Sequence, residues 1–236
     1  APDIGIPSSL NNPDTSGRSV EELNNAGIAA LQDGWLLGAR KYFETAVRDS
    51  VNATQNQADT ARFFLALTRV AALGFDTSTD GDFSVLERMG DILDRLGVAN
   101  DDSRGDLSTI ELPETLPDNS PTGDEFQVFL DNVTGSELRG ALDNLGQISN
   151  TFSVTWTEPF LNGQPVESDY GDVLFFRGLL GSILALVDIQ KAYNLDGDID
   201  EASGTTVGTF LNTNASFLTL EDTGKLAEAK GVALEA

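Results

Sequence analysis

The sequence contains no cysteine and no histidine. Without cysteine the chain has neither disulfide bonds nor a thiolate nucleophile, although this absence does not fix its redox compartment. Without histidine it lacks the most common general base, and a zinc site would have to be built from carboxylates alone. Any catalysis by this chain would therefore have to use groups other than imidazole and thiol, such as carboxylates.

Positive charge is also scarce. The sequence has 14 Lys and Arg against 38 Asp and Glu, which gives a formal charge of -24. Such a chain repels phosphate backbones and anionic membrane surfaces, so nucleic acid is excluded as a partner. The carboxylates serve either solubility outside the cell or the binding of divalent cations. Because 40% of the 236 residues are hydrophobic, the composition is that of a folded protein despite its charge.

No segment is apolar for long enough to span a membrane. The most apolar stretch covers residues 173–187, is interrupted by Arg177 and falls short of the roughly 20 residues that a span requires. Its composition predicts a buried core helix.

The first 18 residues predict an extended, helix-poor segment. This segment is rich in proline, serine and asparagine, and the chain begins Ala-Pro-Asp rather than with methionine. Such a start is typical of a mature protein after leader removal, so we expect a secreted, extracellular or periplasmic location. Asn52, Asn132 and Asn214 each begin an Asn-X-Ser/Thr triplet, which is a glycosylation acceptor only in a suitable host.

The hydrophobic spacing predicts a mainly α fold of antiparallel αα-hairpins with one small β-hairpin. Ser19 and Glu22 form a capping-box pattern at the start of the first helix. The predicted helices cover residues 19–33, 36–49, 58–73, 84–96, 124–130, 136–145, 171–193 and 221–234, and the predicted strands cover 152–157 and 165–167. A proline-containing linker at 98–123 separates a helical region at 19–97 from a second one at 124–236.

The first helical pair resembles a tetratricopeptide repeat. Small residues stand where two helices must cross closely, a glycine stands at the turn, and one large side chain fills the groove beside them. The matching residues are Gly27, Gly34, Ala39, Phe43 and Ala46. The proline usual at the repeat end is replaced by Val51, and only one repeat matches well. The resemblance implies a helical scaffold for protein–protein contact; any αα-hairpin with alanine at its crossing is the alternative.

The segment 76–87 resembles an EF-hand calcium loop. Oxygen-bearing residues occupy the ligand positions, Gly81 allows the sharp turn, and an apolar residue follows at Phe83. The resemblance implies Ca²⁺ ligands at Asp76, Ser78, Asp80, Asp82 (through its backbone carbonyl) and Glu87, with Ser84 holding a bridging water. A serine in place of an aspartate indicates a weak, extracellular type of site. The alternative is an acidic connection in which Ser84 caps the next helix.

A second acidic loop, at 194–200, also presents oxygen ligands around a glycine. Its candidate Ca²⁺ ligands are Asn194, Asp196, Asp198 and Asp200, but the outer EF-hand positions hold Ala192 and Ser203. A third frame at 100–111 has Arg104 at a ligand position and is interpreted as a loop.

Two function classes follow. The first is a non-enzymatic, calcium-stabilised secreted structural protein that self-associates into a filament or surface layer, with a tetratricopeptide adaptor for another protein as the alternative. The second is a carboxylate-based hydrolase, in which Glu158 and Asp169 flank an aromatic segment containing Trp156 and Tyr170. We favour the first.

Overall fold

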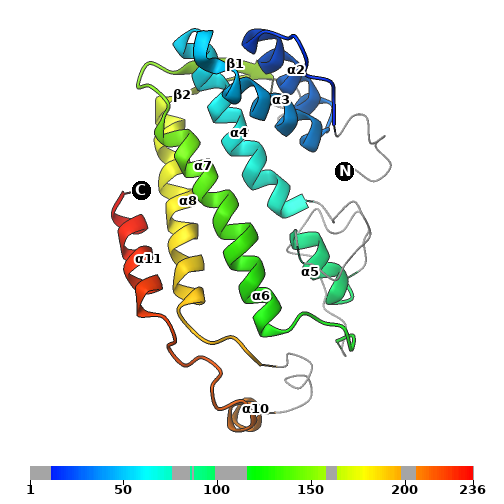
Figure 1. The fold of residues 1–236 in the computed structure, drawn as a ribbon, viewed down its shortest axis with the longest axis vertical. Helices are drawn as coiled ribbons and strands as arrows, with labels where there is room; N and C mark the ends of the chain where they lie inside the picture. Colours follow the sequence, from blue (N-terminus) through cyan, green and yellow to red (C-terminus); the bar gives the residue numbers. More distant parts are fainter. Residues whose placement is uncertain are drawn as a thin grey trace. The chain divides into compact units, whose positions relative to one another are not determined.

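The computed structural model (Figure 1) describes residues 12–75, 86, 88–98, 116–157, 164–197 and 206–235. It confirms a mainly helical chain with one small antiparallel sheet. The helices are α2 (Val20–Gln32), α3 (Leu36–Arg48), α4 (Gln55–Phe75), α5 (Met89–Arg95), α6 (Gly123–Phe129), α7 (Ser136–Gly146), α8 (Tyr170–Lys191), α10 (Val207–Thr213) and α11 (Thr223–Glu235), with a 3₁₀ turn η1 (Ser50–Asn52) and a π-helical segment η4 (Leu130–Gly135).

The chain divides into two compact units, and neither is continuous in sequence. Unit 1 contains Ala1–Ala72, Glu137–Gly181 and Ala236, whereas unit 2 contains Leu73–Ser136 and Ser182–Glu235. Each unit therefore combines residues from both sides of the predicted linker at 98–123.

Unit 1 begins with the hairpin of α2 and α3. The predicted capping box is present, because Ser19 Oγ accepts from the Glu22 N–H and the Glu22 carboxylate accepts from the Ser19 N–H. The turn at Gly34 has a φ of +80°, which favours glycine. At the crossing, Gly27 lies directly against the ring of the fully buried Phe43.

Gly27→Ala is expected to destabilise unit 1 by about 1–3 kcal/mol through overpacking. A Cβ at residue 27 would lie 2.6 Å from the Phe43 ring, which cannot retreat because its side chain is fully buried. Gly146→Ala at the end of α7 is the matched control, since it also belongs to unit 1, is exposed, and its Cβ would meet nothing within 4 Å; it should change the free energy of unfolding by less than about 0.5 kcal/mol. Urea titration of each variant checks this, and equal effects at both glycines would contradict it.

Aromatic side chains fill the centre of unit 1. Phe64 of α4 stacks on Phe43 with ring centroids 5.2 Å apart and meets Trp156 edge-on at 5.1 Å. Phe63, on the same helix, packs on Phe152 at 5.1 Å. These contacts join α4 to the hairpin α2–α3 and to the sheet.

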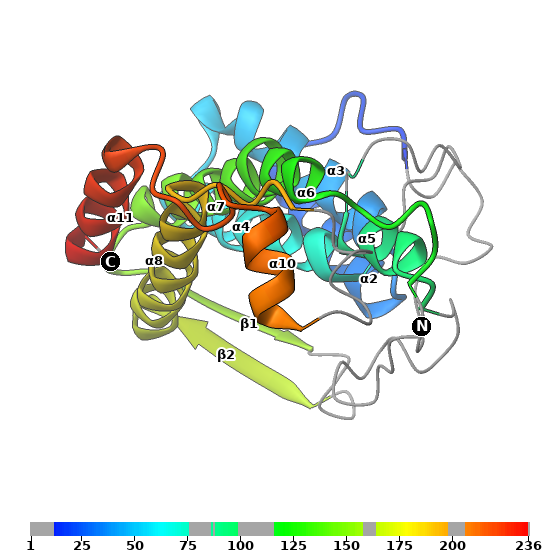
Figure 2. The same ribbon diagram turned by 90° about the horizontal axis from the view of Figure 1, so that it is seen from below.

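The sheet consists of β1 (Ser153–Thr157) and β2 (Pro165–Asp169), which run antiparallel with Thr155 opposite Glu167 (Figure 2). The predicted strand and its return are thus confirmed. Trp156 Nε1 donates to Ser168 Oγ at 3.1 Å, which fixes the indole across the two strands.

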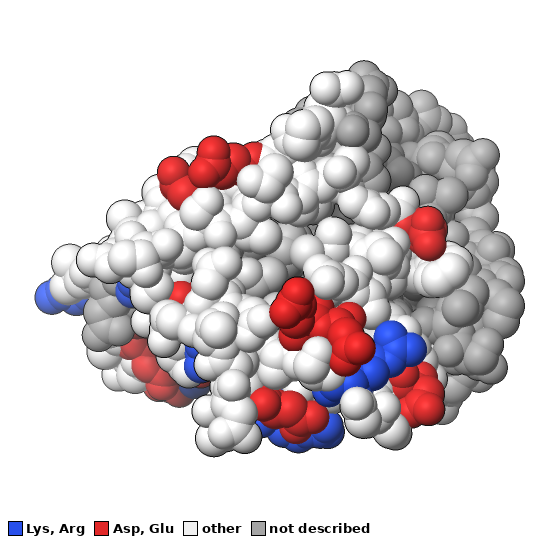
Figure 3. Space-filling view, turned by 90° about the horizontal axis from the view of Figure 1, so that it is seen from above, with Lys and Arg blue, Asp and Glu red and all other residues white. Residues whose placement is uncertain are grey.

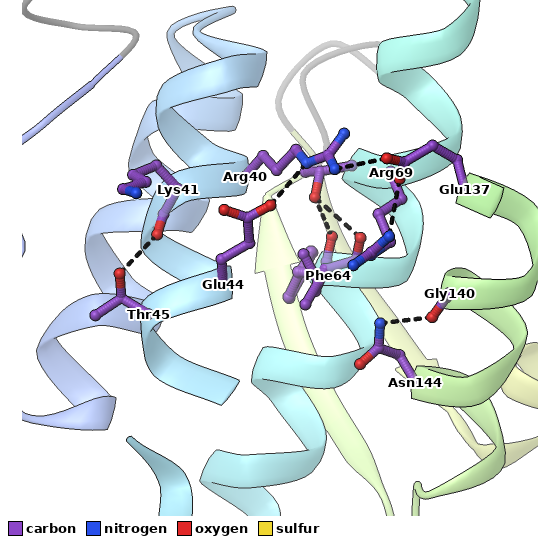
Figure 4. Close-up of polar contacts among 11 residues, drawn as sticks. Arg40, Lys41, Glu44, Thr45, Phe64, Arg69, Glu137, Gly140 and Asn144 are labelled. Atoms are coloured by element: carbon purple, nitrogen blue, oxygen red, sulfur yellow. Dashed lines mark hydrogen bonds and ion pairs between the residues drawn. The ribbon is translucent and has the colours of Figure 1, made fainter. Parts of the chain in front are cut away.

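A charged network ties α3, α4 and α7 together (Figure 4). Glu137 accepts hydrogen bonds from Arg40 at 2.8 Å and from Arg69 at 3.0 Å, and Arg40 also donates to Glu44 at 2.9 Å. Burial lowers the pKa of Arg40, but its hydrogen bonds to Glu137 and Glu44 outweigh that effect and raise it. The network keeps these cations occupied inside unit 1.

A buried carboxylate provides a second polar anchor in unit 1. Asp59 of α4 is fully buried and accepts from Gln55 Nε2 at 2.9 Å and from the Ser149 N–H and Oγ at 3.1 and 2.6 Å. Arg62 approaches the same carboxylate at 3.5 Å. Asp59 therefore fastens α4 to the loop that follows α7.

Unit 2 has its own apolar and polar contacts. Leu86, Ile92 and Phe129 form an apolar cluster. Arg95 donates to both oxygens of Glu125, at 2.9 and 2.7 Å, and this hydrogen bond holds the pKa of the Glu125 carboxyl below its ordinary value. Within this unit, α11 lies beside the second half of α8 in both ribbon views (Figures 1 and 2).

Two predicted helix boundaries are wrong. The helix expected from residue 84 begins at Met89, since Leu86 is not helical and the Arg88 backbone is extended; its N–H donates to Asp91 Oδ2 at 2.9 Å. The helices expected at 124–130 and 136–145 are joined, because η4 carries the helical backbone through Leu130–Gly135 as a π-helix.

The described part of the N-terminal segment contacts its own chain. The Thr45 hydroxyl donates to Thr15 Oγ1 at 3.3 Å, and the Arg18 guanidinium lies 5.3 Å from the centre of the Tyr42 ring. Both contacts attach residues 12–18 to α3.

Candidate interaction surface

The strongest predicted calcium loop cannot be placed. Asp76, Ser78, Asp80, Asp82 and Glu87 all lie outside the described residues. Among the described residues near this loop, Leu86 is not helical and helix α5 begins at Met89. Calcium binding at 76–87 stays a prediction.

The second predicted loop is described only in part. Asn194 Oδ1 accepts from the Asp196 N–H at 2.8 Å, and Asn194 Nδ2 donates to Glu221 Oε1 at 2.7 Å. The Asn194 backbone also bonds to Thr219 and Leu218, so this residue fastens its loop to the segment before α11. Asp198 and Asp200 lie outside the described residues. Within the described ranges, no group of three or more Asp and Glu is arranged to hold a metal ion.

The residues considered for hydrolase chemistry have local structural roles where they are described. Asp169 Oδ1 accepts from the Gly171 N–H at 2.6 Å at the start of α8. Trp156 packs against Phe64 and Ser168 rather than standing free as a sugar platform. Glu158 lies outside the described residues.

The most distinctive surface of the described chain is one side of α8. This helix is uninterrupted from Tyr170 to Lys191, with its first half in unit 1 and its second half in unit 2. Large apolar side chains are exposed along it: Leu174 48%, Phe175 67%, Leu179 44%, Ile183 38%, Leu186 61% and Ile189 40%.

Part of this apolar side follows coiled-coil spacing. Phe175, Leu179, Ser182, Leu186 and Ile189 succeed one another at intervals of four, three, four and three residues, and all are exposed. This is the heptad spacing that keeps one stripe of a helix facing a partner helix. We call these five residues the α8 seam.

The prediction of a buried core helix at 173–187 is therefore wrong for one side of α8. Val173, Leu180, Leu184, Ala185 and Val187 are buried as expected, but the seam is in solvent. Mean hydropathy sums over all sides of a helix and cannot tell a helix buried all round from one with two apolar faces. The heptad spacing was readable in the sequence and would have revealed the seam.

The seam carries no charge. At about 100° per residue, Arg177, Asp188 and Lys191 lie on the opposite side of α8. The Asp188 side chain is fully buried, and Lys191 is 4% exposed between it and Asp131. No helix in the described ranges is long and apolar enough to cross a membrane.

No protein-family model matches the chain, and neither a curated protein nor a solved structure is significantly similar to it. Function must therefore be inferred from the chemistry of the α8 surface.

Charged side chains are scattered over the face drawn in Figure 3, most of which belongs to uncharged residues. On the face drawn in Figure 3, carboxylates form separate patches, and most Lys and Arg lie beside carboxylates. Arg48, for instance, pairs with Asp49 at 2.7 Å. What sets α8 apart is that its exposed apolar residues follow one another along a single helix, and a contiguous apolar surface of this kind marks a binding site.

Proposed function

We propose that the chain is a non-enzymatic interaction subunit that binds a second copy of itself through the α8 seam. The observation that carries the proposal is the exposed heptad spacing from Phe175 to Ile189. A helix with such a stripe lowers its free energy by packing the stripe against another helix of the same spacing, and α8 of a second copy has that spacing by definition.

Electrostatics supports a pairing at this surface. Two copies that each carry a formal charge of -24 repel wherever carboxylates meet. Salt screens that repulsion beyond about 8 Å at physiological ionic strength, so the contact surface itself must be low in charge. The seam meets this requirement because the charged residues in the second half of α8 point away from it.

The test is sedimentation equilibrium of the wild-type chain from about 1 μM to 1 mM, the range of a weak to moderate protein complex. We expect a reversible shift from monomer to dimer within this range. A strict monomer at the highest concentration would overturn self-association.

Extracellular location and stabilisation by calcium belong to the same proposal. Their support is the acidic composition and the loop sequence at 76–87. A cation bound there would neutralise carboxylates in a chain that has few cations of its own.

Addition of 10 mM CaCl₂ is expected to raise the melting temperature of the chain, whereas Glu87→Gln removes most of the rise. For a site in the weak, extracellular range, ligand in ten- to hundred-fold excess over Kd stabilises by about 1.4–2.7 kcal/mol. Asp33→Asn, which also removes one carboxylate, is the control and should keep the response. Isothermal titration calorimetry that detects no heat with calcium at millimolar concentration would contradict the prediction.

A further inference from the structure

We propose that α11 exchanges between two copies of the chain, with Leu218 as the hinge, so that α11 of each copy docks on unit 2 of the other. This contact is separate from the α8 seam and does not depend on it. The proposal follows from the backbone conformation of Leu218, from the hydrogen bonds that hold the segment before α11, and from the weak anchoring of α11 itself.

The backbone of Leu218 is strained. Its φ of +62° lies in the left-handed region, which costs conformational free energy in every residue that has a Cβ. Among the described residues it is the only one other than glycine with a positive φ. Its side chain is 54% exposed, so burial of the leucine does not offset the strain. A chain that straightens at Leu218 releases the strain, and strained connections favour exchange between copies.

The four residues that precede α11 are held by the loop that follows α8. The N–H groups of Glu221 and Asp222 donate to the Ala192 carbonyl at 2.8 and 3.1 Å. The Asn194 N–H donates to the Thr219 carbonyl at 2.8 Å, and Asn194 Nδ2 donates to Glu221 Oε1 at 2.7 Å. Ala192 is fully buried, and a buried carbonyl requires a donor. These bonds therefore have to be kept or replaced when α11 moves.

The helix α11 is weakly anchored and is a poor helix by itself. Of residues 223–234, only Ala229 is buried, so little apolar surface is uncovered when α11 leaves its site. Gly224 and Gly231 lower its intrinsic helix propensity, and an isolated helix of 13 residues is marginal in water. The helix can thus leave one docking site at low cost, but it needs another.

Exchange between two copies meets all of these conditions together. If a single chain straightens at Leu218, the Ala192 carbonyl loses two donors and α11 loses its docking site. If two chains straighten, each offers the other an identical loop after α8, so the same hydrogen bonds form between chains. The gain is the strain released at two hinges, and the cost is the entropy of bringing two copies together.

The absence of cysteine makes the exchange testable by disulfide cross-linking. Tyr193 and Leu220 form an isolated antiparallel bridge, which places their Cα atoms within the range of roughly 4.4–6.8 Å that a disulfide requires. Chains with Tyr193→Cys are mixed with chains with Leu220→Cys, unfolded in urea, refolded together at about 1 mM and mildly oxidised. A docked mixed dimer forms only where residue 220 of one copy lies beside residue 193 of the other.

Three controls make the result specific. All chains also carry Phe175→Glu and Leu186→Glu, which disable the α8 seam. A single chain with both cysteines, at positions 193 and 220, should close its own disulfide when dilute, which shows that the bridge can be cross-linked. Tyr193→Cys mixed with Val207→Cys measures random collision, since Val207 is 75% exposed. We expect intact-mass spectrometry to show at least about ten-fold more mixed dimer than this background, because docking holds the two thiols together.

Two substitutions at the hinge should act in opposite directions. Leu218→Gly removes the strain of the closed chain, because glycine adopts a positive φ freely, and it should lower the yield of mixed dimer by roughly 5–30-fold for each hinge. Leu218→Val should raise the yield, because a β-branched residue tolerates the left-handed region poorly and favours an extended backbone. Circular dichroism checks that both variants keep their helices.

The outcomes separate this inference from the proposed function. A mixed dimer at the collision background, with the disulfide closed in the double-cysteine chain, overturns the exchange of α11 and leaves the seam standing. A mixed dimer with the same yield for Leu218→Gly and Leu218→Val overturns the role of Leu218 as the hinge. The seam is tested separately by sedimentation of the wild-type chain, which is never unfolded, and a strict monomer there overturns the seam alone.

Discussion

Phe175→Glu combined with Leu186→Glu is expected to make the chain monomeric and to weaken self-association by roughly 10²–10³-fold. Both side chains are more than half exposed, at 67% and 61%, so the fold of one copy loses little. In the pair, however, each glutamate would be placed against apolar side chains, and residues of this kind at the centre of an interface cost roughly 2 kcal/mol or more when disrupted. Each 1.4 kcal/mol is about ten-fold in Kd.

The control must add the same charge elsewhere. Val128→Glu combined with Val207→Glu changes two exposed apolar residues, 57% and 75% exposed, on α6 and α10. It raises the net negative charge by the same amount, so any difference between the two variants is due to where the glutamates lie. Sedimentation equilibrium of both variants measures the effect, and a control variant that dissociates as readily as the seam variant would refute a specific role for the seam.

Asp59→Ala should lower the free energy of unfolding of unit 1 by about 3–5 kcal/mol, the range for breaking a buried charged pair. The carboxylate is fully buried, and its loss leaves the Ser149 N–H, the Ser149 hydroxyl and the Gln55 amide without their acceptor. It also leaves Arg62 without its nearby counter-charge. A buried donor that has lost its acceptor costs more free energy of folding than its hydrogen bond had contributed.

Tryptophan fluorescence during urea titration can measure this loss, because Trp35 and Trp156 both belong to unit 1. Asp143→Ala on α7 is the control; this aspartate is exposed, and its replacement should change stability by less than about 0.5 kcal/mol. A loss below about 1 kcal/mol for Asp59→Ala would mean that the loop after α7 is held by other contacts.

Local signals in the sequence predicted most of the elements. The capping box at Ser19 and the glycine turn at Gly34 placed the hairpin of α2 and α3, and alternation of apolar and polar residues, with many β-branched and aromatic side chains, placed β1. These signals work because each depends on neighbours a few residues away. The predicted extent of α8, 171–193, differs from the observed Tyr170–Lys191 by at most two residues at either end.

Features that depend on distant residues could not be predicted. Asp59 was indistinguishable in sequence from the many surface carboxylates, because its donors on Ser149 lie 90 residues away. The π-helical segment joined two helices that the spacing predicted as separate. The division into units that each take residues from both sides of 98–123 follows from tertiary contacts alone.

The symmetry of the seam limits the assemblies that it can support by itself. A two-fold interface pairs a surface with the same surface of a second copy. Each subunit can therefore bind only one partner through α8. A filament or a surface layer needs a second, independent contact to continue growing. If the protein polymerises, the seam therefore supplies dimeric building blocks. The Phe175→Glu and Leu186→Glu variant would then either form filaments built from single subunits or fail to polymerise.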